Sequence, residues 1–527
     1  MVFFAFAGLE EGSLSVLETR LRALPRTVLA NLRRGIEKES LRVRPDGALA
    51  ATPHPQGLGS ALTHPHITTD FCESQLELIT GVHSSAQACL EELTQIHQVV
   101  FRHIGDEMLW CASMPCGLPA DDSIPIGRYG TSNIGRAKTV YRAGLGYRYG
   151  RRMQTISGIH YNFSLPDEAW PALGIAGPNE GYFALIRNFR RHAWLLFYLF
   201  GASPAVCPSF VEGRDHRLEQ LKPGTLYLPY ATTLRMGRLG YQSDAQSSIA
   251  ASFNSLEEYG ASLEEALLKP YAPYEKIGIR DESGENRQLA TSLLQIENEF
   301  YGKIRPKRRI HSGERPLHAL RERGVEYVEV RLMDLDPFAP AGITAQTMQL
   351  LDVFLLHCVL RESPPETSAQ ADAIARNQER VAARGREPGL RLASGNGDVA
   401  LIDWGRELLD ECAPIAGALD AASGNPQYSA ALEAAAGTLA NPSATPSARV
   451  LATMAQRHEN SYTAFVLAQS RAHQATLKGT EFPGAAAKRF DQMAAESVAS
   501  QHKMEAADTL PFEAWRQRYL SAEMLRA

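Results

Sequence analysis

The segment Ser157-Gly-Ile-His-Tyr-Asn-Phe-Ser-Leu-Pro166 decides the fold, because its apolar and polar side chains alternate. Residues two apart share one face of a β-strand. One face therefore carries Ile159, Tyr161, Phe163 and Leu165, and the other carries His160, Asn162 and Ser164. This pattern predicts an antiparallel strand with one face in the core and one polar face.

Similar alternation predicts further strands with acidic faces. Three more segments of this kind are Arg34–Val43 with Glu37 and Glu39, Leu293–Tyr301 with Gln295, Glu297, Glu299 and Tyr301, and Glu326–Leu332 with Tyr327, Glu329 and Arg331. The segment 68–80 adds Asp70, Glu73 and Glu77. A solvated sheet face would explain any one of these strands. The set favours a functional face, because neighbouring carboxylates repel each other unless cations lie between them.

The residue types on this face indicate its chemistry. Carboxylates with one histidine and one asparagine suit Mg²⁺, whereas zinc would need more histidine or cysteine. Arg235 and Arg331 suit a phosphoryl group or a carboxylate substrate, although either could form a structural ion pair. No G-x-x-x-x-G-K-[ST] motif is present. The sequence therefore predicts a nucleoside triphosphate site with several magnesium ions and no P-loop.

Composition excludes several classes of protein. The net charge of the 527 residues is -5, so no basic field indicates nucleic acid as a partner. The longest apolar run, 193–206, is shorter than the roughly 20 residues of a membrane span, and the N-terminal run lacks the features of a signal peptide. The seven cysteines include no C-x-x-C pair. We therefore expect free thiols, neither a disulfide framework nor a zinc site, and a cytoplasmic protein.

The chain changes character after Pro337. Residues 12–34 and 180–200 have helical periodicity, 225–335 has strand-like alternation, and 344–362 and 400–436 are rich in Leu and Ala at helical spacing. We expect a catalytic core containing the sheet over 12–340. A mainly helical remainder over 341–527 should pack on that core as part of one large domain.

Ten motifs in order resemble proteobacterial glutamate–cysteine ligase. They are Glu37-Lys-Glu-Ser-Leu-Arg42, Leu58-Gly-Ser-Ala-Leu-Thr63, Ile67-Thr-Thr-Asp-Phe71, Ser113-Met-Pro-Cys116, Gln154–Phe163, Leu199-Phe-Gly-Ala-Ser-Pro204, Tyr227-Leu-Pro-Tyr-Ala-Thr232, Leu294-Gln-Ile-Glu-Asn-Glu299, Ile304-Arg-Pro-Lys307 and Glu326-Tyr-Val-Glu-Val-Arg331. The likeness runs from about Arg34 to about Pro340, with scattered matches beyond.

The resemblance implies an α+β fold of the glutamine synthetase-like carboxylate–amine ligase type. A curved, mostly antiparallel sheet would hold ATP and three Mg²⁺ ions, with helices on the outside and a helical C-terminal part. By this likeness the metal ligands are Glu37, Glu39, Asp70, Glu77, His160 and Glu329, with Asn162 beside them. Arg235, Arg331 and Arg142 would hold the transferring phosphate. The cysteine pocket would be lined by Phe71, Tyr141, Leu145, Gln154, Tyr241 and Tyr301.

The implied reaction joins L-glutamate to L-cysteine at the expense of ATP, as the first step of glutathione biosynthesis. The resemblance also implies a monomer that glutathione inhibits by feedback. A related ligase with another amine acceptor, and a nucleotide- or metal-binding protein without turnover, are the alternatives. Cys72 departs from the family pattern and could place an oxidisable thiol beside the site.

Overall fold

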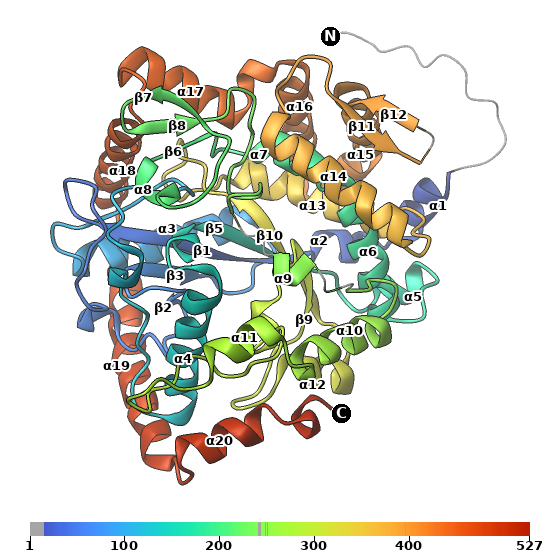
Figure 1. The fold of residues 1–527 in the computed structure, drawn as a ribbon. Coiled ribbons are helices and arrows are strands. Elements are labelled where there is room, and N and C mark those ends of the chain that lie inside the picture. The colour runs from blue at the N-terminus through green and yellow to red at the C-terminus, as the bar shows by residue number, and fades with distance from the viewer. Residues whose placement is uncertain (1–14, 241–243, 248, 250, 396, 527) are drawn as a thin grey trace.

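The strand that contains His160 lies at the centre of an antiparallel sheet (Figure 1). The computed structural model describes residues 15–526 except 241–243, 248, 250 and 396. Its main sheet has seven strands in the order β2-β3-β1-β5-β10-β9, with β4 paired to β1. The strands are β1 (Arg33–Val43), β2 (Ile67–Thr69), β3 (Gln75–Ile79), β4 (Met108–Leu109), β5 (Gly158–Ser164), β9 (Ile304–Lys307) and β10 (Tyr327–Asp334). All these pairs are antiparallel, as predicted.

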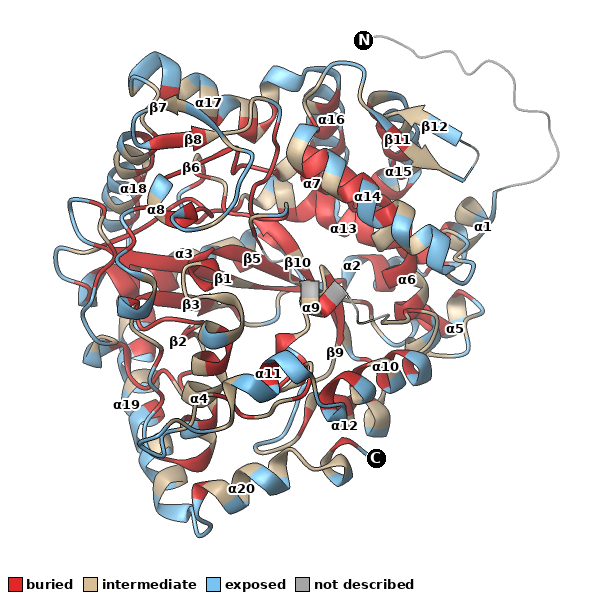
Figure 2. Cartoon of the chain, in the orientation of Figure 1, coloured by how far each residue is buried: buried red, intermediate tan, exposed pale blue. Residues whose placement is uncertain are grey.

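Helices cover the apolar face of this sheet. They are α3 (Ala86–His103), α6 (Pro178–His192), α7 (Trp194–Phe200) and α13 (Ala345–Leu360). Side chains such as Ile36, Tyr161 and Val330 are wholly buried beneath them, and Figure 2 shows these strands and α13 as buried. The Ser85 side chain caps α3, and the Thr344 side chain caps α13, by accepting backbone N–H groups of the first turn. The predicted helices over 180–200 and 344–362 are therefore confirmed.

The other helices surround this core. They are α1 (Val16–Ala23), α2 (Arg26–Ala30), α4 (Asn133–Tyr149), α5 (Ala169–Ala172), α8 (Pro208–Val211), α9 (Asp244–Ser247), α10 (Leu256–Leu268), α11 (Ala272–Ile277), α12 (Pro316–Arg323), α14 (Ser368–Arg384), α15 (Leu401–Ser423), α16 (Gln427–Ala440), α17 (Pro446–Arg457), α18 (Tyr462–Gly479), α19 (Gly484–Ala507) and α20 (Phe512–Tyr519). There are also two small sheets. One has three strands in the order β6 (Ala205–Val206), β8 (Thr225–Tyr227) and β7 (Glu219–Lys222), and the other pairs β11 (Arg391–Ser394) with β12 (Gly397–Ala400).

One hydrophobic cluster joins the main sheet to α13, α15 and α16. Helices that follow residue 341 therefore share the core of the sheet. At the other end of the molecule, α19 and α20 run along the side that carries α4 (Figure 1). Within the part of the chain that the structure describes, no helix combines the length and apolar character that a membrane crossing needs.

Two of the strand predictions are wrong. The segment 293–301 contains only a short 3₁₀ turn at Glu297–Glu299, and much of 256–277 forms α10 and α11. In the first segment the backbone N–H of Gln295 donates to the Glu299 carboxylate rather than to a neighbouring strand. Glu297 binds Arg315 and Glu299 binds Arg148. The alternation of these acids therefore reflects the anchoring of a loop and not a sheet face.

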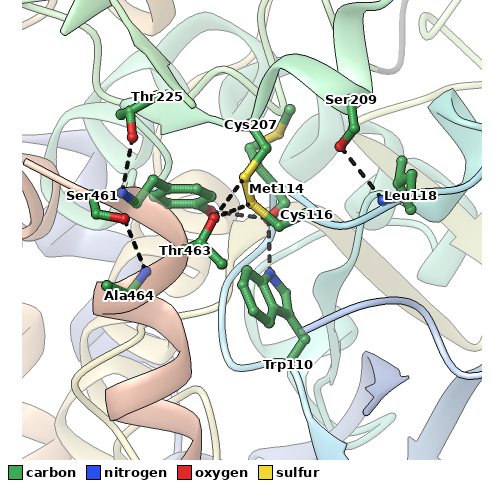
Figure 3. The surroundings of a disulfide bond; sticks show 11 residues. Trp110, Met114, Cys116, Leu118, Cys207, Ser209, Thr225, Ser461, Thr463 and Ala464 are labelled. Carbon is green, nitrogen blue, oxygen red and sulfur yellow. Dashed lines mark hydrogen bonds between the residues drawn. A yellow bond between two sulfur atoms is a disulfide. The ribbon is translucent and has the colours of Figure 1, made fainter. Parts of the chain in front are cut away.

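The expectation of free thiols is wrong for two cysteines. Cys116 and Cys207 form a disulfide with their Cα atoms 5.3 Å apart, and the Thr463 hydroxyl of α18 contacts both sulfur atoms (Figure 3). The two cysteines are 91 residues apart in the sequence, so only folding brings them together. The remaining cysteines are free and buried; they are Cys72, Cys89, Cys111, Cys358 and Cys412.

A buried ion pair fixes the sheet to its covering helix. Arg34 of β1 and Asp352 of α13 lie 2.9 Å apart, and their side chains are at most 1% exposed. The Tyr161 hydroxyl of β5 donates to Asp352 at 2.6 Å. Asp352 thus joins two strands and one helix, and its loss would leave a buried guanidinium without a counter-charge.

We expect Asp352→Asn to lower the free energy of unfolding by about 3–5 kcal/mol, because the substitution leaves the Arg34 charge buried and unpaired. Urea unfolding followed by circular dichroism measures this change. The control is Glu265→Gln, since the Glu265–Lys269 pair is exposed and should contribute little. Equal unfolding midpoints for the two variants would contradict the role of Asp352.

Candidate active site

Three strands bring an acid, a histidine and a second acid together on the polar face of the sheet. In the antiparallel register, Glu37 of β1 lies opposite His160 of β5, and Glu329 of β10 lies opposite Asn162. One ligand atom each from Glu37, His160 and Glu329 lies within 4.8 Å of the other two. The His160 Nδ1 atom is 3.1 Å from a Glu37 oxygen, and the Asn162 amide donates to the other Glu37 oxygen at 2.9 Å.

A second pair of acids extends this cluster toward the edge strand. Glu39 of β1 lies opposite Glu77 of β3, and Asp70 follows directly after β2. The backbone N–H of Gly158 donates to Glu39 at 2.7 Å. All the predicted metal ligands line one cavity of about 450 Å³; they are Glu37, Glu39, Asp70, Glu77, His160 and Glu329.

The charges in this cluster are only partly balanced by protein cations. Burial alone would raise the pKa of Glu329, but Lys307 and Arg331, at 3.2 and 3.1 Å, hold it well below its usual range. Burial and the charge of Asp70 instead raise the pKa of Glu39 to about 8. Burial and Glu37 raise the pKa of Glu77 well above its usual range. Added cations would relieve this repulsion.

Two predicted arginines meet at one end of the acid cluster. The Arg235 guanidinium donates to the Arg331 carbonyl at 2.9 Å and lies against β5, where a Cβ atom at Gly158 would come within 2.0 Å of it. The need for this close approach explains a glycine at position 158. A smaller cavity there is lined by His160, Arg235, Met236, Tyr301, Gly302, Lys303 and Arg331.

Arg142 lies on a different wall of the larger cavity. Its guanidinium donates to the carbonyls of Thr69, Asp70 and Lys138, so it fixes the turn after β2 against α4. Its charge still faces the cavity that the acids line.

Most of the predicted cysteine-pocket residues lie on the same cavity wall. The residues that line it are Phe71, Tyr141, Leu145, Gln154 and Tyr301. The Gln154 amide donates to the Tyr301 hydroxyl at 2.8 Å, which fixes the ring of Tyr301. Tyr241 lies outside the described residues.

Two residues that the sequence placed near the site have other roles. The Glu73 carboxylate accepts the backbone N–H groups of His54 and Arg128, so it holds loops together away from the cavity lining. Cys72 is completely buried, and burial raises the pKa of its thiol to about 12. A thiol in that environment is unreactive, so the expectation of an oxidisable group is wrong.

The donor set fits magnesium. Asn162 Oδ1 is buried, and among the described residues no group donates a hydrogen bond to it. Oxygen atoms dominate the cluster, and a single histidine is too few nitrogen ligands for a typical zinc site.

Comparisons with known proteins agree with this geometry. The sequence model of the family described as glutamate-cysteine ligase matches residues 19–381. A glutamate–cysteine ligase from Alcanivorax borkumensis is 46% identical over 520 residues, which are 95% of this chain and 99% of that protein. A second from Pseudomonas fluorescens is 48% identical over 511 residues, 94% and 96% of the two chains. This chain belongs to the glutamate–cysteine ligase family.

The structural comparison extends this result to the fold. The crystal structure of glutamate–cysteine ligase from Francisella tularensis in complex with AMP has a TM-score of 0.89 at 36% identity, covering 94% of this chain and 98% of that one. A bifunctional glutathione synthetase from Pasteurella multocida has a TM-score of 0.70 at 26% identity, covering 91% of this chain and 58% of that one. The predicted glutamate–cysteine ligase family and its α+β fold are therefore confirmed.

Sequence reasoning missed several cations of the ligase site. Lys307, Arg305 and Lys138 line the cavity, and Lys307 forms an ion pair with Glu329. The segment Ile304–Lys307 was a family motif in the sequence, but its alternation is interrupted by Pro306. Only the pairing of Glu329 of β10 with Arg305 of β9 shows which side chains of the segment Ile304–Lys307 reach the site.

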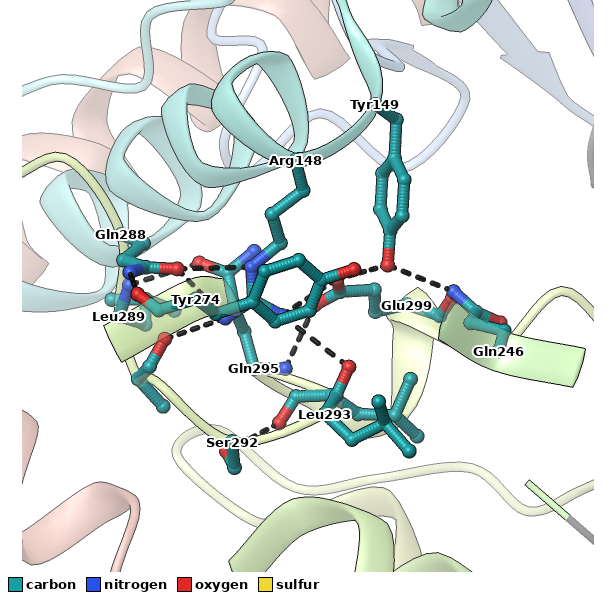
Figure 4. Close-up of polar contacts among 12 residues, drawn as sticks. Arg148, Tyr149, Gln246, Tyr274, Gln288, Leu289, Ser292, Leu293, Gln295 and Glu299 are labelled. Atoms are coloured by element: carbon teal, nitrogen blue, oxygen red, sulfur yellow. Dashed lines mark hydrogen bonds and ion pairs between the residues drawn. The ribbon is translucent and has the colours of Figure 1, made fainter. Parts of the chain in front are cut away.

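A buried polar network supports the loop that carries Tyr301 (Figure 4). The Glu299 carboxylate accepts from Arg148 at 2.9 Å, from the Tyr149 hydroxyl at 2.7 Å and from the Gln295 backbone at 2.7 Å. The Gln246 side chain accepts the Tyr301 N–H at 2.9 Å. The side chains of Arg148 and Glu299 have no solvent exposure. This network therefore positions the cavity wall between Leu289 and Tyr301.

We expect Glu299→Gln to loosen this wall, because Arg148 would lose its buried counter-charge. Amide hydrogens in residues 289–301 should exchange roughly tenfold faster or more, as measured by mass spectrometry. Glu282→Gln, on an exposed turn nearby, is the control. Unchanged exchange in 289–301 would show that the loop does not depend on Glu299.

Proposed function

We propose that this chain catalyses the ATP-dependent ligation of the γ-carboxylate of L-glutamate to the amine of L-cysteine. The product is γ-glutamylcysteine, and the reaction is the first step of glutathione biosynthesis. The observation that carries the proposal is the set of Glu37, which is partly buried, with the buried His160 and Glu329, gathered within 4.8 Å on the sheet face of a family member. Arg331 and Lys307 flank the set, as a triphosphate site requires.

Magnesium fits this cluster. We assign Glu37, Glu39, Asp70, Glu77, His160 and Glu329 as its ligands, with Asn162 beside them, and the resemblance implies three ions. When bound, Mg²⁺ would neutralise the charge of the phosphate oxygens. The unpaired Asn162 oxygen and the raised pKa values of Glu39 and Glu77 support cation binding at this place.

The arginines suit the phosphoryl transfer itself. In the first step a glutamate γ-carboxylate oxygen attacks the γ-phosphorus of ATP, the bond to the bridging oxygen breaks, and ADP leaves. Arg235 and Arg331, with Arg142 across the cavity, would hold the transferring phosphoryl group. Such a transfer depends on positioning and on neutralising charge, which accounts for a site of acids and arginines without a protein nucleophile.

The second step forms the amide bond. The cysteine amine attacks the acyl carbon of γ-glutamyl phosphate, one amine proton is released, and inorganic phosphate leaves with the C–O bond electrons. Phe71, Tyr141, Leu145, Gln154, Tyr301 and the undescribed Tyr241 are assigned to the cysteine pocket. The hydrogen bond from Gln154 to Tyr301 supports a preformed pocket wall.

We expect Glu37→Gln and Glu329→Gln each to reduce ATP cleavage that depends on glutamate and cysteine by about 10²-fold or more. Each substitution removes one charge from the proposed magnesium cluster and keeps the size of the side chain. Phosphate release with both amino acids present measures the rate.

Glu326→Gln is the matched control for these variants. Glu326 directly precedes β10 but is exposed, and its carboxylate contacts only the backbone of Arg309 among the contacts described. Ligation near the wild-type rate in both Glu37→Gln and Glu329→Gln would contradict the magnesium assignment. Phosphate release by the wild-type protein also decides against a binding protein without turnover.

We expect Tyr301→Ala to raise the KM for cysteine more than the KM for glutamate, because the ring and its contact with Gln154 are lost from the acceptor pocket. Tyr230→Ala, at an exposed position, should change neither constant. Equal increases for both substrates would indicate that Tyr301 serves packing alone. Offering other small amino acids and simple amines in the same assay tests the related-ligase alternative.

The remaining partners of the proposed enzyme come from the resemblance. A monomeric state, feedback inhibition by glutathione and a cytoplasmic location stay predictions. Addition of glutathione to the phosphate-release assay, with glutamate varied, tests the predicted feedback inhibition.

A further inference from the structure

A buried acid outside the two cavities faces the Arg235 guanidinium. Asp334 is the last residue of β10, three positions after Arg331, and its side chain is 1% exposed. Its Oδ1 atom lies 3.9 Å from Nη1 of Arg235, whose side chain is 2% exposed. Arg235 and Arg331 line the smaller cavity, whereas Asp334 lines neither of the two cavities described above. Asp334 therefore contacts Arg235 from the protein side.

One of the ordered sequence motifs holds the first oxygen of this carboxylate. The motif Leu199–Pro204 joins α7 to β6. Within it, the backbone N–H of Ala202 donates to Asp334 Oδ2 at 2.9 Å, and the Ser203 hydroxyl donates to the same oxygen at 2.7 Å. Ala202 and Ser203 are themselves buried. The motif therefore fixes the carboxylate at the end of β10.

A second motif holds the other oxygen and leads to the arginine. Thr233 directly follows the motif Tyr227–Thr232, and its hydroxyl donates to Asp334 Oδ1 at 3.0 Å. A parallel bridge pairs Thr233 with Ser203, so the two motifs meet at the acid. Arg235 lies two residues beyond Thr233. The same contacts thus fix the acid and the backbone that carries the arginine.

Two acids act on the Arg235 charge, and they differ in what else they serve. Glu39 lies near enough for Arg235 to lower its pKa, but Glu39 lines the larger cavity and is a proposed magnesium ligand. Asp334 has no such second role. Burial raises the pKa of Asp334, and Arg235 and the three hydrogen-bond donors oppose that rise. Asp334 therefore remains as a counter-charge to Arg235 when cations engage Glu39.

We propose that Asp334 is a positioning residue for phosphoryl transfer, because it fixes the direction in which Arg235 presents its guanidinium to the γ-phosphoryl group. This inference rests on the proposed function, which makes Arg235 a ligand of that group. The transfer depends on alignment, and a displacement of about 1 Å can reduce the rate about 10²-fold. The motifs around Ser203 and Thr233 then contribute to the reaction by holding Asp334 in place.

The first test compares two Asp→Asn variants of the full chain. Asp334→Asn keeps the size of the side chain and removes the charge beside Arg235, so kcat should fall about 10²-fold while the KM for cysteine stays near wild type. Asp352→Asn is the matched control, because Asp352 is equally buried and paired with an arginine on the apolar face of the same sheet. It should lower stability and leave kcat near wild type at a temperature where circular dichroism shows both variants folded.

The second test measures binding by calorimetry in the presence of Mg²⁺. The β,γ-imido analogue of ATP carries a γ-phosphoryl group and ADP does not. Asp334→Asn should weaken binding of the analogue roughly tenfold and leave binding of ADP near wild type, since a hydrogen bond from a charged group is worth about 1.5–3 kcal/mol. Arg235→Gln should show the same difference, and adding Asp334→Asn to Arg235→Gln should cause no further loss.

These measurements separate the inference from the proposed function. Losses that multiply in the double variant would overturn the role of Asp334, as would equal losses of kcat in Asp334→Asn and Asp352→Asn. If Asp334→Asn does not fold, Thr233→Val decides, because it removes one donor to Oδ1 and keeps the charge. Weaker binding of the analogue but not of ADP in Thr233→Val supports the inference, and unchanged binding of both overturns it. If the wild-type protein releases no phosphate, the proposed function fails, and the binding measurements still test Asp334.

Discussion

The antiparallel register of β1, β5 and β10 is the constraint on which the site depends. It places Glu37 opposite His160 and Glu329 opposite Asn162, so three separate segments supply one cluster. Side chains alternate between the faces of a strand, so a slip of one residue would turn each acid into the core and each apolar residue toward the cavity. The buried apolar face, with Tyr161 and its contact to Asp352, prevents such a slip.

Protein cations neutralise only some of the buried acids of the site. Arg331 and Lys307 neutralise Glu329, whereas burial and the charges of neighbouring acids raise the pKa values of Glu39 and Glu77. The excess of acid has no structural benefit in a protein without bound cations, since buried like charges are destabilising. The site is therefore arranged for positive charge that arrives with its ligands, and its walls are held by networks outside it, such as that of Glu299.

Sequence patterns predicted some parts of the site better than others. The faces of β1, β5 and β10 were correct because period-two alternation identifies a half-buried strand directly. The same alternation was misleading at Glu297 and Glu299, where carboxylates bind arginines that are distant in sequence and the backbone forms a loop. The pairing of Cys116 with Cys207 and the approach of Trp515 to the cavity left no local signal, since both join segments far apart in the chain.

The sequence by itself determined the chemistry of one sheet face and the family, because alternation and ordered motifs are local properties of the chain. Alternation by itself did not show which acids gather at the cavity, although the family resemblance named them, and nothing in the sequence showed that Lys307, Arg305 and Lys138 face them. Glu73 and Glu77 are equally acidic and four residues apart, so their spacing does not distinguish them; the fold shows that Glu73 binds loop N–H groups and that Glu77 lines the cavity. The physical reason is that strand pairing and helix packing set the distances between side chains, and charge interactions depend on those distances rather than on spacing along the sequence.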